Sequence, residues 1–306
     1  MNSQRCGRCA AVAMLAVVAL MAAGCEREAA RSPEGDATRA SVSVCVSIPP
    51  QAFIVERIGG DRVSVEVLVG PGQSPTTYEP APAQMSTLDR ADVYFRIGVP
   101  FEETLMGRIS ASMPHLNVVD LRRGIELQPI GDHDHQEGRQ HGRLDPHTWL
   151  DPELAAVQAE TIRDELTRLD PHRTATYEAN LEALLADLED VDRDIAEMLD
   201  PFAGRKMFVF HPAFGYFARA YELEQVAIEI EGKEPAPREL QHIVELAEEE
   251  GLRAIFVQPQ FSDRSARAIA AEVDTQIIEL DPLARDYLSN LREMARKIRS
   301  GLGDDA

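Results

Sequence analysis

The sequence predicts an α/β protein with two similar βα lobes, each with a mostly parallel sheet, joined by one long rigid helix. Three observations lead to this prediction. Short apolar runs alternate with amphipathic segments, which is typical of βα units. The same alternation occurs twice along the chain. Between the two occurrences, apolar residues recur at spacings of three and four, which indicates one buried face of a long helix.

Residues 1–24 are predicted to be a signal peptide. Two arginines, Arg5 and Arg8, precede an apolar run that ends in small residues before Cys25, and the run is shorter than a bilayer-spanning helix. The small residues before Cys25 resemble the lipobox of bacterial lipoproteins, although Ala22 stands where Leu is preferred. We therefore expect Cys25 to be lipidated; a plainly cleaved secretory signal is the alternative. Residues 25–40 read as a tether between the membrane and the folded body.

The N-terminal lobe is expected over residues 41–170. Its strands are predicted at Val42–Ile48, Val63–Val69, Asp92–Gly98 and Leu116–Leu121. Its helices are predicted at Gln51–Ile58, Pro82–Leu88, Phe101–Ser112 and Pro152–Leu169.

The linking helix is expected over residues 171–200. Asp170 and Pro171 separate it from the preceding helix, because proline both stops one helix and opens the next. Its length of about 40 Å would span both lobes. The C-terminal lobe is expected over residues 201–306, with strands at Lys206–Phe210, Gln225–Ile230, Arg253–Gln258 and Thr275–Leu280. Its helices are expected near Phe214–Tyr221, Pro237–Glu250, Asp263–Val273 and Ala284–Ile298.

The composition excludes several classes of protein. With 31 Lys and Arg against 52 Asp and Glu, the formal charge is −21, which argues against nucleic-acid binding because that needs a basic face. An acidic surface suits a protein that gathers cations. Cys6 and Cys9 leave with the signal, so only Cys25 and Cys45 remain, and the mature chain is not disulfide-stapled unless those two pair.

Three residues are candidate metal ligands. His211 and Asp281 each follow a predicted strand, and His147 precedes a predicted helix. Ligands of open α/β sheets bind beyond the carboxyl ends of the strands, here between the lobes. Two imidazoles and one carboxylate suit a divalent transition ion, zinc above all. Taken singly, each residue also has a structural reading, as a hydrogen-bonded histidine or as an Asp-Pro turn.

Six stretches resemble, in order, the zinc/manganese family of metal-binding substrate-binding proteins of bacterial ABC transporters: Ser47–Pro50, Gly70–Pro80, Asp145–Pro152, Phe210–Phe217, Pro259–Ser262 and Leu280–Leu283. The resemblance implies two lobes, a rigid helix, a buried site for one ion and delivery of that ion to a membrane permease. It implies ligand roles for His147, His211 and Asp281. Manganese-selective members tend to have a carboxylate at the position of His211, so the resemblance favours zinc, with manganese as the alternative.

The sequence departs from this family at Thr76, where a histidine normally supplies the remaining ligand. We expect water or a histidine from elsewhere at that position. A His- and acid-rich tract without apolar residues offers His133, His135 and His141, which we expect to contact metal as auxiliary ligands. The acidic residues Glu229, Glu231 and Glu234 are expected to form a solvated turn or a contact surface for the permease.

Two other function classes compete with transport. A metal-dependent hydrolase could use two histidines, one aspartate and a vacant position, but the sequence has no His-Glu-x-x-His helix and no Gly-x-Ser-x-Gly elbow. A surface adhesin is the second competitor. We expect a monomeric, non-enzymatic binding protein in the periplasm or on the cell surface, attached to the membrane only through its lipid.

Overall fold

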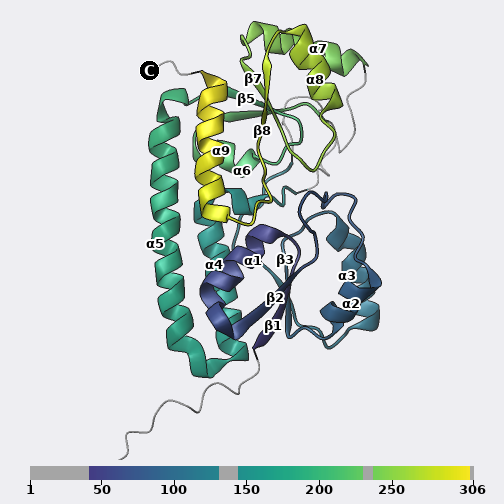
Figure 1. Ribbon diagram of the computed structural model, residues 1–306, viewed down its shortest axis with the longest axis vertical. Helices are drawn as coiled ribbons and strands as arrows, with labels where there is room; N and C mark the ends of the chain where they lie inside the picture. The colour runs from purple at the N-terminus through teal and green to yellow at the C-terminus, as the bar shows by residue number, and fades with distance from the viewer. Residues whose placement is uncertain (1–40, 131–143, 230–236, 304–306) are drawn as a thin grey trace, which may run out of the picture. The chain divides into compact units, whose positions relative to one another are not determined.

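The computed structural model describes residues 41–130, 144–229 and 237–303. The predicted signal peptide, tether, Cys25 and auxiliary histidines His133, His135 and His141 lie outside these residues, as do Glu231 and Glu234. The described chain contains two four-stranded sheets, arranged with their helices as Figure 1 shows.

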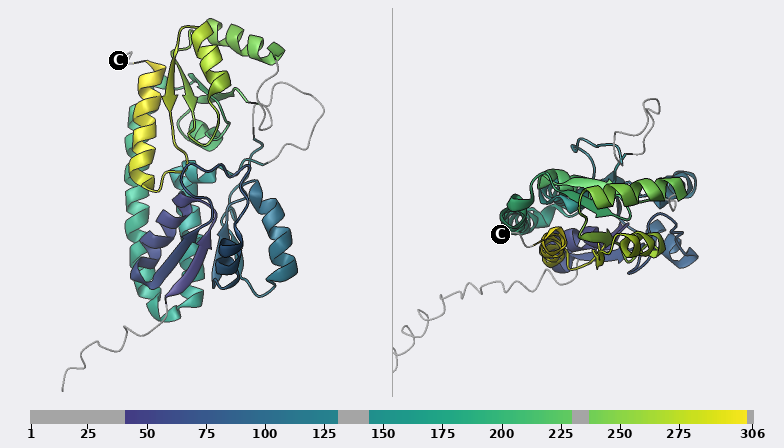
Figure 2. Two further views of the ribbon diagram at one scale, coloured as in Figure 1. Left: turned by 45° about the vertical axis from the view of Figure 1, so that its right-hand side comes forward. Right: turned by 90° about the horizontal axis from the view of Figure 1, so that it is seen from above.

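The sheet of the N-terminal lobe is entirely parallel. Its strands are β1 (Val42–Val46), β2 (Val63–Val67), β3 (Val93–Arg96) and β4 (Val118–Asp120), in the order β2-β1-β3-β4. Helix α1 (Pro49–Gly59) covers one face, and α2 (Pro82–Asp89) and α3 (Phe101–Ser112) lie on the other side (Figures 1 and 2). The β-branched residues of β1 explain its central place, since a parallel strand is buried on both faces: Val44 and Val46 are fully buried.

The sheet of the C-terminal lobe repeats this order. Its strands are β5 (Lys206–Val209), β6 (Glu224–Ala227), β7 (Ala254–Val257) and β8 (Gln276–Glu279). They run parallel in the order β6-β5-β7-β8. Its helices are α6 (Gly215–Ala220), α7 (Pro237–Glu249), α8 (Arg264–Glu272) and α9 (Tyr287–Leu302). Parallel strands place all their carboxyl ends at one edge, so the loops after β5, β6, β7 and β8 meet there.

Helix α5 (Thr174–Leu199) connects the lobes and follows α4 (Pro152–Leu169). It packs against α1 and α4 and also against α9. Its buried face repeats at helical spacing, and consists of Tyr177, Leu181, Leu184, Leu188, Val191, Ile195 and Leu199. The fold class is therefore confirmed: two parallel-sheet α/β lobes and one long helix.

The largest apolar cluster extends from Val42 to Leu302 and includes residues of α4, α5 and α9. The two sheets thus share a continuous core, because α5 and α9 carry it from one to the other. The boundaries at residues 170 and 200 stay predictions.

Several helix ends differ from those expected. The last helix runs from Tyr287 to Leu302, not from Ala284 to Ile298. The linking helix is bounded by short 3-10 turns, Pro171–Arg173 and Asp200–Phe202. Both turns contain a proline, which lacks the amide hydrogen that a regular α-helical turn uses.

Cys45 is a fully buried free thiol on the central strand β1. Burial, reinforced by the charge of Glu66, raises the pKa of this thiol to about 12. It is therefore an unreactive core side chain at neutral pH. Among the described residues, no helix combines the length and apolar character needed to cross a bilayer.

Two neighbouring leucines of α5 test how far the shared core determines stability. Leu184 is fully buried, whereas Leu185 is only partly buried at the edge of the same cluster. We expect Leu184→Ala to lower the free energy of unfolding by about 2–5 kcal/mol, through lost transfer energy and a residual cavity. Leu185→Ala is the matched control, because it removes the same atoms. It should lower the free energy of unfolding, measured with urea, by clearly less. Equal losses would contradict this assignment of the buried face.

Candidate metal centre

His147 lies in the segment between β4 and α4, directly before the 3-10 turn Thr148–Leu150. It is buried, with 8% of its surface exposed. Asp145 Oδ1 accepts hydrogen bonds from the His147 backbone amide at 2.9 Å and from its Nδ1 at 2.6 Å. Since a carboxylate only accepts, Nδ1 carries the proton and the lone pair of Nε2 is available to a metal.

His211 follows β5 and is held in the same way. Its Nδ1 lies 2.5 Å from Oε1 of Glu229, which follows β6 next to it in the sheet. Burial lowers the pKa of His211, and the nearby His147 acts in the same direction, while the bond to Glu229 opposes the shift. A lowered pKa favours the neutral imidazole at neutral pH, which is the form that binds metals.

The structure brings these two imidazoles together from segments 64 positions apart, since they are residues 147 and 211. Their ring centroids are 5.3 Å apart and the rings are inclined at 74°. Each ring has its Nδ1 engaged by a carboxylate, so the lone pair of each Nε2 atom is available to bind a metal ion. Two imidazole nitrogens in a buried, acidic setting suit zinc.

Asp281 follows β8 and is fixed by three hydrogen bonds. Its Oδ1 accepts from Gln260 Nε2 at 2.6 Å and from the Leu283 amide at 3.0 Å. Its carbonyl accepts from Asn290 Nδ2 at 2.8 Å. Within 41–130, 144–229 and 237–303, however, no three His, Cys, Asp or Glu side chains form a group that could hold a metal. The assignment of Asp281 as the third ligand therefore stays a prediction.

Thr76 lies in the loop after β2 and is half-buried. Its amide donates to Ser74 Oγ at 3.3 Å. The loop is tied to the start of α3 by a bond from the Phe101 amide to the Pro75 carbonyl, 3.2 Å long. Glu79, the nearby acidic residue, forms a 2.8 Å ion pair with Arg108 of α3. That contact joins the loop to α3 at an exposed position, where an ion pair contributes little to stability.

The sequence analysis did not identify two residues that hydrogen-bond to the candidate ligands. Asp145 stands two positions before His147, a spacing that signals a local side-chain-to-backbone turn. Glu229 was expected in a solvated turn or in a contact surface for the permease, and this is wrong: it is 5% exposed and accepts a hydrogen bond from His211 Nδ1. No local signal identifies it, because the parallel pairing of β5 and β6 creates the contact.

Trp149 links the segment of His147 to the loop of Asp281. It is buried, its ring centroid lies 5.2 Å from that of His147, and its Nε1 donates to the Pro282 carbonyl at 2.8 Å. The hydroxyl of Tyr287, at the start of α9, donates to the Trp149 carbonyl. The two segments that carry the predicted ligands His147 and Asp281 are thus joined through Trp149, although they are far apart in sequence.

A second anchor comes from helix α6. The Tyr216 hydroxyl accepts from the Gln128 amide at 3.1 Å and donates to the Asp145 carbonyl at 3.3 Å. Gly215 lets this helix approach, because a Cβ there would lie 2.8 Å from Asp145 Oδ2. The His147 segment is therefore held by the C-terminal lobe as well as by its own.

The motif at the end of β1 has a structural role. Ser47 Oγ donates to Glu102 at 2.6 Å and lies 2.7 Å from the Tyr94 hydroxyl. The amides of Ile97 and Gly98 also bind Glu102. Burial raises the pKa of Glu102, and these hydrogen bonds oppose the shift. Each oxygen of this buried carboxylate is satisfied, which fixes the strand ends of the N-terminal lobe.

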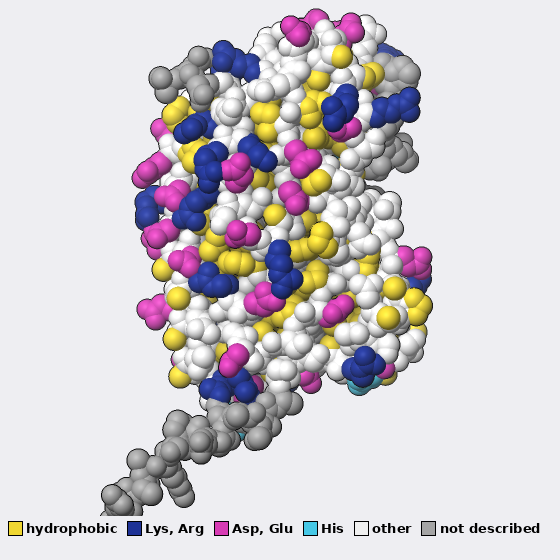
Figure 3. Space-filling model, in the orientation of Figure 1, with side chains coloured by type: hydrophobic (Ala, Val, Ile, Leu, Met, Phe, Trp, Pro, Cys, Tyr) yellow, Lys and Arg dark blue, Asp and Glu magenta, His cyan; other side chains and the backbone are white. Residues whose placement is uncertain are grey.

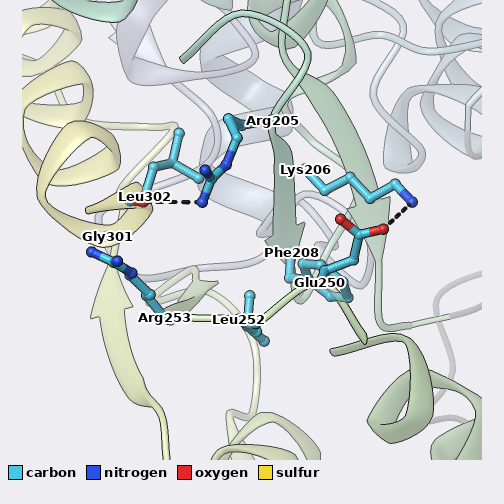
Figure 4. A pocket seen from close by; sticks show the side chains of 9 residues that line it. Arg205, Lys206, Phe208, Glu250, Leu252, Arg253, Gly301 and Leu302 are labelled. Carbon is cyan, nitrogen blue, oxygen red and sulfur yellow. Dashed lines mark hydrogen bonds and ion pairs between the residues drawn. The ribbon is translucent and has the colours of Figure 1, made fainter. Parts of the chain in front are cut away.

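A small pocket elsewhere in the C-terminal lobe has a different chemistry (Figure 4). It lies at the amino ends of β5 and β7, the opposite edge from His211, and is lined by Arg205, Lys206, Glu250 and Arg253 among others. Lys206 Nζ is paired with Glu250 at 2.8 Å. No histidine lines it, so it does not resemble a zinc site.

The chain is similar to known proteins over most of its length. Residues 44–301 match the family described as ZnuA, zinc-uptake complex component A, periplasmic. The manganese-binding lipoprotein MntA of Halalkalibacterium halodurans is 30% identical over 303 residues, covering 94% of this chain and 97% of the relative. The high-affinity zinc uptake system protein ZnuA of Bacillus subtilis is 26% identical over 283 residues, covering 88% and 87%.

A solved structure gives the same result. A crystal structure of ZnuA superimposes with a TM-score of 0.81 at 42% identity, covering 86% of this chain and all of that chain. The family resemblance predicted from the ordered sequence motifs is thus confirmed, and this chain belongs to the ZnuA family of periplasmic zinc-uptake components.

Proposed function

We propose that this protein is an extracytoplasmic solute-binding protein that captures a divalent transition ion, zinc in the first place, and delivers it to an ABC permease. One observation carries the proposal: the rings of His147 and His211 lie edge to face, 5.3 Å apart, with both Nδ1 atoms engaged by buried carboxylates. This arrangement orients Nε2 and raises its basicity, as in metal sites where a carboxylate supports a ligating histidine.

Zinc is favoured over manganese by the donor atoms. Imidazole nitrogen suits zinc, whereas manganese prefers carboxylate, carbonyl and water oxygens. Relatives of this chain include proteins named for each metal. A structure of a ZnuA deletion mutant with zinc bound is 42% identical and superimposes with a TM-score of 0.79, which supports the choice of zinc.

The names of the relatives also support a proposal about location and anchoring. Relatives are named as lipoproteins of metal transport, which supports a periplasmic or cell-surface location. We propose that Cys25 carries the lipid and that the folded body acts as a monomer.

The described face in Figure 3 shows acidic and basic side chains interspersed along α5 and α9, which suits a solvated surface. We expect no enzymatic activity, and esterase and peptidase assays with added zinc should give none.

Zinc binding should raise the melting temperature of the purified protein, because the ion binds the folded state preferentially. We expect one tightly bound ion. His211→Ala should abolish most of the rise, and His147→Ala should do the same. His172→Ala, an exposed histidine in the turn before α5, is the matched control and should keep the full rise. An unchanged zinc-induced shift in His211→Ala would remove this ligand assignment.

Glu229→Gln should weaken zinc binding by about 10–100-fold, the usual cost of losing the carboxylate behind a ligating histidine. The substitution keeps the size of the side chain and removes its charge. Glu224→Gln, at an exposed position of the same strand β6, is the control and should leave affinity unchanged. Chelator competition measures both. If the two variants bind zinc equally well, Glu229 does not support the ligand.

Thr76 is predicted to leave one coordination position to water or to another histidine. Thr76→His should tighten zinc binding, because it restores the nitrogen donor of the family pattern. Thr76→Val keeps the shape without the oxygen and should change affinity little. A tenfold loss in the Val variant, equal to about 1.4 kcal/mol, would show that the Thr76 hydroxyl itself holds the ion or its water.

The auxiliary role of His133, His135 and His141 stays a prediction, since they lie outside the described residues.

A further inference from the structure

The segment Gln258–Phe261 lies between the two predicted ligands of the C-terminal lobe. It follows β7, which pairs with β5 on one side and with β8 on the other. His211 follows β5, and Asp281 follows β8. The segment contributes no predicted ligand, yet its side chains contact both.

Two side chains of this segment fix His211. Gln258 makes two hydrogen bonds to its backbone, accepting from the amide at 3.1 Å and donating to the carbonyl at 3.0 Å. Phe261 stacks on the imidazole, with ring centroids 4.3 Å apart and planes inclined at 23°. Together with Glu229, these contacts set the position and the plane of the ring.

Gln260 acts on the other ligand. Its Nε2 donates to Asp281 Oδ1 at 2.6 Å, and the Leu283 amide donates to the same oxygen at 3.0 Å. Both donors that the described residues offer to this side chain therefore bind Oδ1, which leaves Oδ2 for a metal ion. The Oε1 atom of Gln260 is buried and has no partner among the described residues. A buried acceptor without a hydrogen bond is unfavourable, so Oε1 does not determine how this amide is oriented. The hydrogen bond from Nε2 to Asp281 does.

The number of carboxylate oxygens that reach an ion influences which ion binds. Zinc in proteins is usually four-coordinate and tetrahedral. Manganese is typically bound in octahedral sites rich in oxygen. A carboxylate that binds through both oxygens raises the coordination number. A carboxylate with one oxygen already committed to two donors is suited to binding through the other oxygen alone.

We propose that Gln260 is a positioning residue that keeps Asp281 a one-oxygen ligand and thereby favours zinc over manganese. The inference rests on the proposed function, because it requires Asp281 to bind the ion. Gln260 itself does not touch the metal; it acts through the carboxylate.

The test compares Gln260→Met with the unaltered protein, loaded in turn with zinc, manganese and cobalt(II). Methionine keeps the length of the side chain and removes its donor. Zinc affinity should fall about tenfold or more, the scale expected for an outer hydrogen-bond partner of a ligand, and manganese affinity should not fall in parallel. The ratio of the two affinities should therefore shift at least tenfold toward manganese. The visible cobalt absorption should weaken, because tetrahedral cobalt absorbs more strongly than cobalt of higher coordination number.

Gln241→Met is the matched control. Gln241 on α7 also donates its Nε2 to a carboxylate, Glu245, at 2.9 Å, but on an exposed helix face. It should leave both affinities and the cobalt spectrum unchanged. If Gln260→Met lowers the melting temperature of the metal-free protein, Gln260→Ala takes its place. The same ratio of zinc to manganese affinity is then measured for Gln260→Ala.

Asp281→Ala separates this inference from the proposed function. If this variant binds zinc as tightly as the unaltered protein, Asp281 is not a ligand and the proposed ligand set fails. If it binds zinc weakly while Gln260→Met changes zinc and manganese affinities equally and leaves the cobalt spectrum intact, the role of Gln260 is overturned. In a variant that combines Asp281→Ala with Gln260→Met, the Gln260 substitution should cause no further change in the ratio of zinc to manganese affinity.

Discussion

Two buried carboxylates, Asp145 and Glu229, determine how the candidate metal centre is built. Each accepts a hydrogen bond from Nδ1 of a histidine, at 2.6 Å for His147 and 2.5 Å for His211. The direction of these bonds follows from chemistry, since a carboxylate has no proton to give. It leaves each Nε2 as a donor and places negative charge behind each ring. Neighbouring aromatic rings also contact the two imidazoles, but only the carboxylates determine which ring nitrogen carries the proton.

The rest of the molecule holds these pairs in place. Glu229 meets His211 because β6 and β5 run parallel as neighbours, so that their carboxyl ends coincide. Trp149 and Tyr216 tie the segment of His147 to the C-terminal lobe. Helices α5 and α9 join the apolar cores of both lobes. A shared core resists independent movement of the lobes, because any large rearrangement would expose apolar surface.

Thr76 is the one position of the candidate site at which the sequence lacks the histidine of the family pattern. Its loop is tied to α3 through Pro75 and through the ion pair of Glu79 with Arg108. The loop therefore contacts α3 although it does not carry the expected imidazole. The carboxylate of Asp281 is also fixed, by donors on one oxygen. The two imidazole nitrogens are well supported by carboxylates, whereas the place of the Asp281 carboxylate in the ligand set stays a prediction.

The sequence by itself determined the fold class, the long helix and the two histidines. Hydrophobic spacing is local and periodic, so the buried face of α5 could be read residue by residue from Tyr177 to Leu199. The histidines stood out because each lies at the end of an element in an ordered set of motifs. The sequence did not show that Glu229 contacts His211, since the two residues are 18 positions apart and meet only through the pairing of β5 with β6. Nor could it show the contacts of Gln258, Gln260 and Phe261, which exist because β7 lies between β5 and β8. Only the tertiary structure decides such contacts, because strand order brings together side chains that share no periodic pattern.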